Sequence, residues 1–309
     1  MVNEYHEPVL SGEVIRYLCT ESDGIYVDCT LGGGGHTAQI LQQGSLECKV
    51  IGIDRDTDAL QVAHENLSEY GNRVKLVQGN FADVRQLLDE LGIEQVQGLL
   101  LDLGVSSHQI NEVSRGFSFQ GNSRIDMRMS KNQALDGWTV VNQYEESQLS
   151  DIFWRYGEER FSRKIARRIV EQREHHSINT TEQLGRVVES VVGQRMLKKS
   201  LARIFQAIRI EVNDELENLE EMLGDAVELL VSGGRIVVIS YHSLEDRIVK
   251  HFFKEQSQPV TSKTKLVQQE ILRDPQLRIL TKKPVEATEE EIRHNSRARS
   301  AKLRAAERI

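Results

Sequence analysis

The chain has 309 residues, of which 39% are hydrophobic and 28% are charged. This length suffices for one large α/β domain or two smaller ones, and the composition is that of a soluble globular protein without long disorder. The formal net charge of −8 excludes nucleic-acid binding over the whole surface, but not at a local basic patch. No apolar run approaches the roughly 18 residues of a membrane span, and no signal-peptide pattern is visible. Cys19, Cys29 and Cys48 lack metal-ligand spacing, which indicates free thiols in a reducing cytoplasm.

The first third of the chain predicts strands that alternate with helices. Short apolar runs predict strands at 24–30, 49–54, 74–80 and 96–104, and helical patterns follow the first three at 36–43, 59–67 and 83–91. Apolar strands separated by helices form parallel sheets with right-handed crossovers. We therefore expect a doubly wound, mostly parallel α/β fold.

This alternation stops after the fourth strand. From about 106 to 213 no convincing strand is found; Thr180 and Gln183 predict a capping box, and apolar spacing predicts one long helix from 201 to about 219. A buried strand at 233–240 and a helix at 244–253 follow, with weak strand character at 277–283 and 297–308. We expect a split α/β domain, 1–109 and 214–309, interrupted by a helical insertion at 110–213 that recognises the substrate.

The segment YVDCTLGGGGHT, residues 26–37, places four glycines between a strand and a helix. Glycine allows positive φ angles and close approach of the backbone to a ligand, and the N-terminus of the next helix favours an anion. Asp54 ends the second strand, 20 residues after Gly34, where a carboxylate can accept hydrogen bonds from ribose hydroxyls. This order of strand, loop, helix and acid predicts a nucleoside-cofactor site.

Two features bear on which nucleoside the loop binds. The dinucleotide pattern G-x-G-x-x-G fits at Gly32 and Gly34 but fails at Thr37. Asp28 would repel a pyrophosphate, but it would attract the ammonium and sulfonium groups of S-adenosylmethionine. The stretch from Asp28 to Gly34 is similar to motif I of class I (Rossmann-like) methyltransferases, which favours this cofactor. An NAD-type oxidoreductase is the alternative.

Asp102 ends the fourth strand at the sheet edge where ligands bind, and the turn after it, DLGV, lacks the Pro-Pro-aromatic signature of many amino-group methyltransferases. Further motifs occur in one order over nearly the whole chain: GGGGHT, GIDRD, LLLDLGVSSHQI, RGFSF, DMRM, YGEERFSRKIARRI, FQAIRIEVNDEL, SYHSLEDRIVK and NSRARSAKLR. Together they closely resemble the RsmH (MraW) family of bacterial small-subunit ribosomal RNA cytosine-N4 methyltransferases.

The resemblance implies methyl transfer from S-adenosylmethionine to the exocyclic N4 of cytidine 1402 of 16S rRNA, near the decoding centre. It implies that these residues contact the cofactor: Gly34, Gly35, His36, Asp54, Phe81, Asp102 and Gln109. Gly33 stands where relatives commonly carry a larger residue, but the Gly-Gly-His after it is intact. Asp102 is our candidate either for the catalytic acceptor of charge developing on N4 or for a group that orients the cofactor.

Each of these residues has a plainer alternative role. Phe81 follows the third strand, where an aromatic ring can pack on adenine or simply belong to the core. His36 could donate to the methionine carboxylate, or could only cap or pack the helix start. Gln109 is implied by the resemblance alone.

Basic residues form three groups in this acidic chain. One lies on the polar arc of a helix expected within 155–173: Arg160, Arg163, Lys164 and Arg167. The others are Arg195, Lys198, Lys199, Arg203 and Arg209, and near the C-terminus Arg297, Arg299, Lys302 and Arg304. They favour contact with phosphates of 16S rRNA or the small ribosomal subunit, although each could be a solvated face. Candidates to stack on the cytosine are Phe117, Phe119, Tyr156 and Tyr241.

In SYHSLEDR, residues 240–247, we expect Ser243 to cap a helix and Glu245 to lie in its first turn, with the role of His242 open.

The scattered His and Cys residues predict no metal site. A non-enzymatic alternative is an RNA-binding assembly factor with a degenerate cofactor site. The sequence leaves open whether the substrate is naked RNA or an assembled subunit, and it is compatible with a homodimer.

Overall fold

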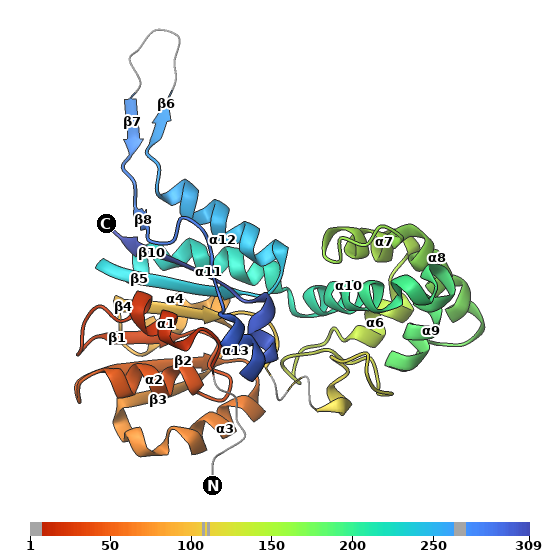
Figure 1. Ribbon diagram of the computed structural model, residues 1–309, viewed down its shortest axis with the longest axis horizontal. Coiled ribbons are helices and arrows are strands. Elements are labelled where there is room, and N and C mark those ends of the chain that lie inside the picture. The colour runs from red at the N-terminus through yellow and green to blue at the C-terminus, as the bar shows by residue number, and fades with distance from the viewer. Residues whose placement is uncertain (1–7, 107–108, 110–111, 263–269) are drawn as a thin grey trace. The chain divides into compact units, whose positions relative to one another are not determined.

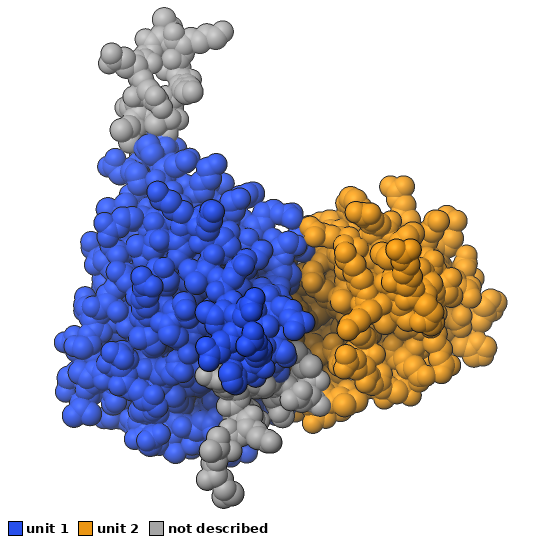
Figure 2. Space-filling model, in the orientation of Figure 1, with its two compact units in different colours: residues 1–104, 217–309 blue, residues 105–216 orange. Residues whose placement is uncertain are grey.

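The computed structural model describes residues 8–106, 109, 112–262 and 270–309. The chain divides into two compact units, which Figure 2 colours separately. Unit 1 comprises residues 1–104 and 217–309, and unit 2 comprises residues 105–216. The second boundary falls inside helix α11 (Glu215–Leu229).

Unit 1 is built on an eight-stranded sheet in the order β3-β2-β1-β4-β5-β10-β8, with β9 paired to β10 (Figure 1). The neighbours from β3 to β5 are parallel, whereas β10 is antiparallel to β5, β8 and β9. The strands are β1 (Ile25–Asp28), β2 (Lys49–Asp54), β3 (Val74–Gln78), β4 (Val96–Asp102), β5 (Leu230–Ser240), β8 (Leu277–Ile279), β9 (Val285–Glu286) and β10 (Lys302–Arg308). The predicted doubly wound, mostly parallel sheet is confirmed.

Helices cover both faces of this sheet, because its central strands are apolar on both sides. Successive side chains of a strand point to opposite faces. Leu99 and Leu101 of β4 pack in one core cluster, with residues of α4 (Val84–Glu90), α11 and α12 (Ser243–Gln256). Leu100 packs in a second cluster, with residues of α1 (Ser11–Leu18) and α2 (Gly35–Gln43). Unit 1 is thus a three-layer α/β/α domain.

Shorter elements complete unit 1. Asp56 caps α3 (Thr57–Asn66) by accepting a hydrogen bond from the backbone N–H of Asp58. The other elements are η1 (Ser68–Arg73), η2 (Phe81–Asp83), α13 (Glu289–His294), η4 (Ser296–Ser300) and the two-stranded sheet of β6 (Val260–Ser262) and β7 (Glu270–Arg273).

Among the described helices of the chain, none is long and apolar enough to cross a bilayer.

Unit 2 is helical. Its elements are η3 (Val113–Arg115), α6 (Gly137–Gln143), α7 (Glu146–Arg155), α8 (Ser162–His175), α9 (Thr181–Val192) and α10 (Gln194–Asn213). The capping box predicted from Thr180 and Gln183 is present at the start of α9. Within the described part of this unit, the only β pairing is an isolated bridge between Arg124 and Thr180.

The prediction of one continuous helix from 201 to about 219 is wrong. Asp214 has φ 51°, ψ 38°, so α10 ends at Asn213 and α11 begins at Glu215. Aspartate tolerates this left-handed conformation better than most residues. The Asn213 side chain donates to the carbonyl oxygen of Met127 at 2.8 Å and accepts from the Met129 N–H at 2.8 Å, which ties the end of α10 to a loop. Apolar spacing alone does not reveal such a break.

A buried ion pair joins β10 to α12. Arg304 Nε lies 2.7 Å from Asp246 Oδ1, and both side chains are largely buried. Arg304, predicted to belong to a surface basic group, is therefore used inside unit 1.

Replacing Asp246 with Ala should lower the free energy of unfolding by about 3 kcal/mol, because it leaves the Arg304 charge buried and unpaired. Urea denaturation followed by circular dichroism measures the change. Glu289→Ala is the matched control, since Glu289 pairs with Arg293 on the surface at 3.4 Å and its loss should change stability by under about 0.5 kcal/mol. Equal effects of the two variants would contradict this account.

Candidate active site

Three acids end neighbouring parallel strands of unit 1. Asp54 ends β2, Asp28 ends β1 and Asp102 ends β4, and these strands are adjacent in the sheet. The chain order reverses between β1 and β4, which is the switch point where doubly wound sheets bind ligands. The acids predicted from the sequence therefore share the sheet edge where a cofactor is expected.

The glycine loop between β1 and α2 needs glycine at specific positions. Gly32 and Gly34 have φ angles of 52° and 83°. A Cβ on Gly34 would lie 2.8 Å from Leu67 Cδ1, so this position also lacks space for a side chain. Gly34 is the N-cap residue of α2 and Gly35 is its first residue. The backbone N–H groups at this helix start suit an anionic group.

Asp54 is tied to the loop. Its Oδ2 accepts a hydrogen bond from the Gly32 N–H at 2.8 Å, and its Oδ1 accepts one from the Asp56 N–H at 2.8 Å. Burial raises the pKa of Asp54 to about 6, although the two N–H donors oppose this shift. The carboxylate is therefore ionised at neutral pH and becomes protonated as the pH falls through about 6.

Asp28 is 1% exposed. It accepts hydrogen bonds from Thr37 Oγ at 2.8 Å and from the Thr30 N–H at 3.3 Å. Burial raises the pKa of Asp28, and the charge of Asp102 acts in the same direction, whereas His36 and the two hydrogen bonds lower it. Thr30 also reaches β4, because its Oγ accepts the Asp102 N–H at 2.6 Å.

His36 is a buried histidine whose ring nitrogens make no hydrogen bond to any residue in the described part of the chain. Its Nε2 lies 3.5 Å from Asp102 Oδ2, an ion-pair separation without hydrogen-bond geometry. A buried polar group normally has a partner. The free ring nitrogens therefore point to a ligand group at this position.

Asp102 is the accessible member of this pair, with a side chain 24% exposed against 7% for His36. Its Oδ1 accepts a hydrogen bond from the Tyr241 hydroxyl at 2.8 Å. Tyr241 follows β5, and the sequence indicates it only as one of four aromatic residues that could stack on the base. Its bond to Asp102 spans 139 residues of sequence, and no local signal indicates it.

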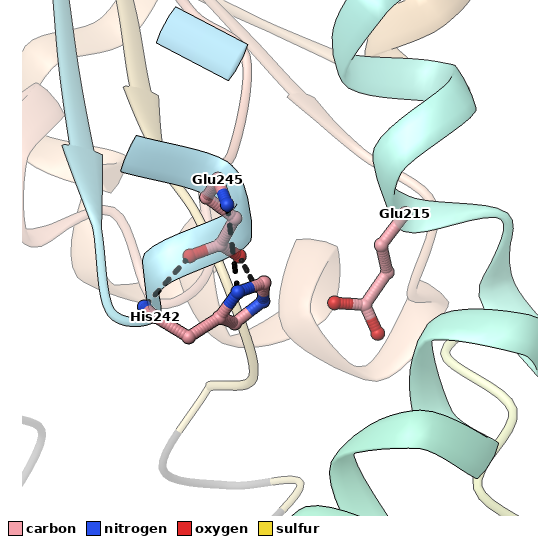
Figure 3. Close-up of side chains that lie close together, drawn as sticks. All are labelled: Glu215, His242 and Glu245. Carbon is pink, nitrogen blue, oxygen red and sulfur yellow. Dashed lines mark hydrogen bonds and ion pairs between the residues drawn. The ribbon is translucent and has the colours of Figure 1, made fainter. Parts of the chain in front are cut away.

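The turn after β5 is organised around Glu245. His242, not Ser243, is the N-cap residue of α12, so the predicted cap is wrong. Figure 3 shows the contacts between His242 and Glu245, which form a capping box. His242 Nε2 lies 3.1 Å from Glu245 Oε1. Glu245 lies in the first turn of α12, as expected, and is buried. Glu215, also drawn in Figure 3, belongs to unit 2.

The remaining candidate cofactor residues lie in different units. Phe81 begins η2 after β3 and is partly buried against the core cluster that includes α4. Gln109 belongs to unit 2, where its side-chain oxygen accepts the Ser106 N–H at 3.0 Å. The cofactor contacts of both residues stay predictions. Parts of the LLLDLGVSSHQI motif, residues 107, 108 and 110, lie outside the described residues.

Unit 2 carries most of the predicted basic residues. Several are exposed and have no ion pair with any described residue: Arg160, Arg163, Lys164, Arg195, Lys198 and Lys199. We call these six residues the basic surface of unit 2. Three others are paired with acids of the same unit: Arg167 with Glu146, Arg203 with Glu159, and Arg209 with Glu215. Pairing makes these three weaker candidates for phosphate contacts.

Among the aromatic candidates, Phe119 packs edge-on against Phe205 with ring centroids 5.6 Å apart. Tyr156 is 7% exposed and lies beside the guanidinium of Arg155. Phe117 is partly exposed, with the Arg115 guanidinium 6.0 Å from its ring centre. Phe117 is thus more exposed than Tyr156 and, among the described residues, has no aromatic ring pair such as that of Phe119.

Comparison with known proteins shows the family of the chain. The model of the MraW methylase family matches residues 3–309. Ribosomal RNA small subunit methyltransferase H of Clostridium botulinum (strain Loch Maree / Type A3) is 47% identical over 306 residues, covering 98% of this chain and 99% of that protein. The protein of the same name from Geotalea uraniireducens is 47% identical over the full length of both chains. That from Carboxydothermus hydrogenoformans is 46% identical, with 98% of each chain covered.

These names describe methyl transfer and not hydride transfer, which decides against the oxidoreductase alternative. They also confirm the resemblance that the ordered motifs predict. The chain therefore belongs to the MraW methylase family and is an S-adenosylmethionine-dependent methyltransferase.

Proposed function

We propose that this protein methylates the exocyclic N4 of a cytidine in 16S rRNA, at position 1402. The observation that carries the proposal is the set of three strand-end acids around a glycine loop, beside a buried histidine whose ring nitrogens make no hydrogen bond to any described residue. The names of the relatives support small-subunit rRNA as the substrate, and the ordered motifs support cytosine N4. The proposed compartment is the cytoplasm, where the small ribosomal subunit is assembled.

The residues present fit S-adenosylmethionine. Asp28 and Asp102 would favour its cationic end, and Asp54 would accept its ribose hydroxyls. The free ring nitrogens of His36 and the N–H groups that begin α2 would hold the methionine carboxylate. We further propose that Phe81 packs on the adenine and that Gln109 contacts the cofactor, as the resemblance implies.

Catalysis of this transfer is mainly a positioning task. The N4 lone pair of cytosine is delocalised into the ring and is a weak nucleophile, so it must be aligned with the methyl group. When bound, S-adenosylmethionine supplies an electrophilic methyl group on a positively charged sulfur. Asp102, with its carboxylate partly exposed at the end of β4, accepts a hydrogen bond from the N4 amine and stabilises positive charge that develops there. The N4 proton then leaves to water, so no dedicated base is required.

Unit 2 would bind the RNA. Its basic surface offers six cations without ion pairs among the described residues, and phosphate contacts of this kind position RNA without reading its sequence. Enzymes that modify a base usually act on an unpaired or flipped-out nucleotide. Phe117 is our candidate to stack on the cytosine. Of the other three aromatic residues, Phe119 packs on Phe205, Tyr156 is buried, and the hydroxyl of Tyr241 is bonded to Asp102.

Label transfer tests the proposed function directly. Incubation of the protein with S-[methyl-³H]adenosylmethionine and unmodified small subunits or naked 16S rRNA should label one cytidine, and mass mapping should place the methyl group on N4. Comparing the two RNAs shows which form is the substrate. Absence of label on both would overturn the proposal and favour an assembly factor, whereas label on another base would overturn the cytosine assignment.

Asp102→Ala should reduce transfer by about a thousandfold or more, because it removes the acceptor near the reacting nitrogen. Circular dichroism should show a fold unchanged from the wild type. Asp89→Ala is the matched control, because Asp89 is an exposed acid in α4. Near-normal turnover by the Asp102 variant would sink this assignment.

The affinity for S-adenosylmethionine should fall as the pH is lowered through about 6. Asp54 is ionised above this pH and is then a strong acceptor for ribose hydroxyls, whereas protonation below it removes the charge. Titration calorimetry at pH 7.5 and pH 5 measures the ratio of the dissociation constants.

Asp54→Asn should weaken binding at pH 7.5 by roughly tenfold, the effect of about 1.4 kcal/mol, and should bring the ratio closer to one. Glu90→Gln, a change at an exposed acid near the end of α4, should behave as the wild type. An Asp54 variant that keeps the wild-type ratio would show that another group is responsible.

A further inference from the structure

We propose that Tyr241 is a positioning residue for methyl transfer: its hydroxyl holds the Asp102 carboxylate so that the second carboxylate oxygen receives the N4 amine. This inference rests on the proposed function and extends it to a residue outside the glycine loop and the strand-end acids. The hydroxyl of Tyr241 donates to Asp102 Oδ1 at 2.8 Å. The other oxygen, Oδ2, faces the His36 ring at 3.5 Å.

Two hydrogen bonds hold Asp102, one through its backbone and one through its side chain. Its backbone N–H donates to Thr30 Oγ at 2.6 Å, which fixes the end of β4 to the loop after β1. The Tyr241 hydroxyl then fixes the rotation of the carboxylate about the last side-chain bond. That torsion is broad and soft in an unrestrained aspartate. Without the hydroxyl, the Asp102 carboxylate would adopt several orientations, and its second oxygen would face the amine in only some of them.

Tyr241 is itself held by a buried acid. The N–H groups of Tyr241 and His242 both donate to Glu245 Oε2, at 2.8 Å and 3.2 Å. Glu245 is 2% exposed, and its other oxygen lies 3.1 Å from His242 Nε2 (Figure 3). The backbone of the turn between β5 and α12 is therefore held by Glu245 at Tyr241 itself. A side chain that positions a catalytic group needs such support from its own neighbours.

The surroundings of Tyr241 keep its hydroxyl protonated, so that it remains a hydrogen-bond donor. Burial and the adjacent charge of Asp102 raise the pKa of Tyr241 well above its usual range, and Glu245 adds to this effect. The charge of Arg297 acts in the opposite direction and lowers the pKa of Tyr241. Arg297 comes shortly before β10, the strand that is antiparallel to β5. The phenol therefore stays protonated at neutral pH and does not act as a base.

The ring of Tyr241 is also used. It packs, partly buried, against the core cluster that contains Ala298 and Ala301. The core packs against this ring, and Asp102 accepts the hydrogen bond of its hydroxyl. The ring is therefore poorly placed to stack on a base that enters the site. The geometry thus favours a role through Asp102 over stacking on the cytosine.

Tyr241→Phe removes only the hydroxyl and tests this role. In single-turnover label transfer, the rate should fall by roughly 10- to 100-fold, the range for losing a hydrogen bond to a charged group. The dissociation constant for S-adenosylmethionine and the KM for the RNA should stay within about twofold of the wild type, because the hydroxyl touches neither. A wild-type rate in this variant would overturn the inference.

Tyr26→Phe is the matched control. The Tyr26 hydroxyl is also buried, but it donates to the backbone carbonyl oxygen of Glu21 at 2.7 Å at the opposite end of β1. This variant should transfer methyl groups at the wild-type rate even where thermal melting shows a small loss of stability. An equal loss of rate in both phenylalanine variants would mean that general destabilisation, and not positioning, causes the effect.

A double-mutant cycle with Asp102→Asn decides whether Tyr241 acts through Asp102. Asparagine keeps one acceptor oxygen, so residual single-turnover transfer is expected. In that background, Tyr241→Phe should change the rate by less than about twofold, because the group that the hydroxyl positions has already been altered. The same fold-loss as in the wild-type background would show independent action and overturn the inference.

Failure of this inference is distinguishable from failure of the proposed function. If the wild-type protein labels no RNA, the proposed function fails first. If the wild type labels cytidine N4 and Tyr241→Phe does so at the full rate, only the role of Tyr241 fails.

Discussion

Hydrogen bonds that run from the glycine loop to neighbouring strand ends are the interactions on which the site depends. The Gly32 N–H reaches Asp54 on β2, and Thr30 Oγ receives the N–H of Asp102 on β4. Thr37, in the helix after the loop, holds Asp28 on β1. The acids of three strands are thus positioned by one short segment. That segment needs the positive φ angles that glycine adopts without strain, so the loop organises the whole sheet edge.

The same arrangement places negative charge where water is scarce. Burial raises the pKa of Asp28 and of Asp54, which means that their ionised forms are disfavoured in the folded protein. Such groups are maintained where they serve a function, because burying a charge opposes folding. The core on both faces of the sheet supplies the compensating stability. A ligand with a cationic centre relieves part of this cost, in agreement with the proposed cofactor.

Local patterns predicted the sheet and its acids, whereas contacts between distant segments were not predictable. Apolar runs of strand length indicated β1 to β5, and the acids that end three of them came from position alone. Tyr241 meets Asp102 across 139 residues, and the buried Arg304 pairs with Asp246, which lies 58 residues before it. His242 replaced Ser243 as the cap because its ring reaches the Glu245 N–H, a contact that residue preferences do not favour. The break at Asp214 depends on one backbone conformation that leaves the apolar spacing unchanged.

The proximity of Asp28 and Asp102 has a consequence for the end of the catalytic cycle. The charge of Asp102 raises the pKa of Asp28, so the two carboxylates repel each other, and a positively charged sulfur near them is attracted by both. In the proposed reaction, the sulfur of the cofactor would become a neutral thioether once the methyl group has passed to N4, and this attraction would be lost. Asp28 and Asp102 would therefore hold the methyl donor more strongly than the demethylated product, which would ease product release.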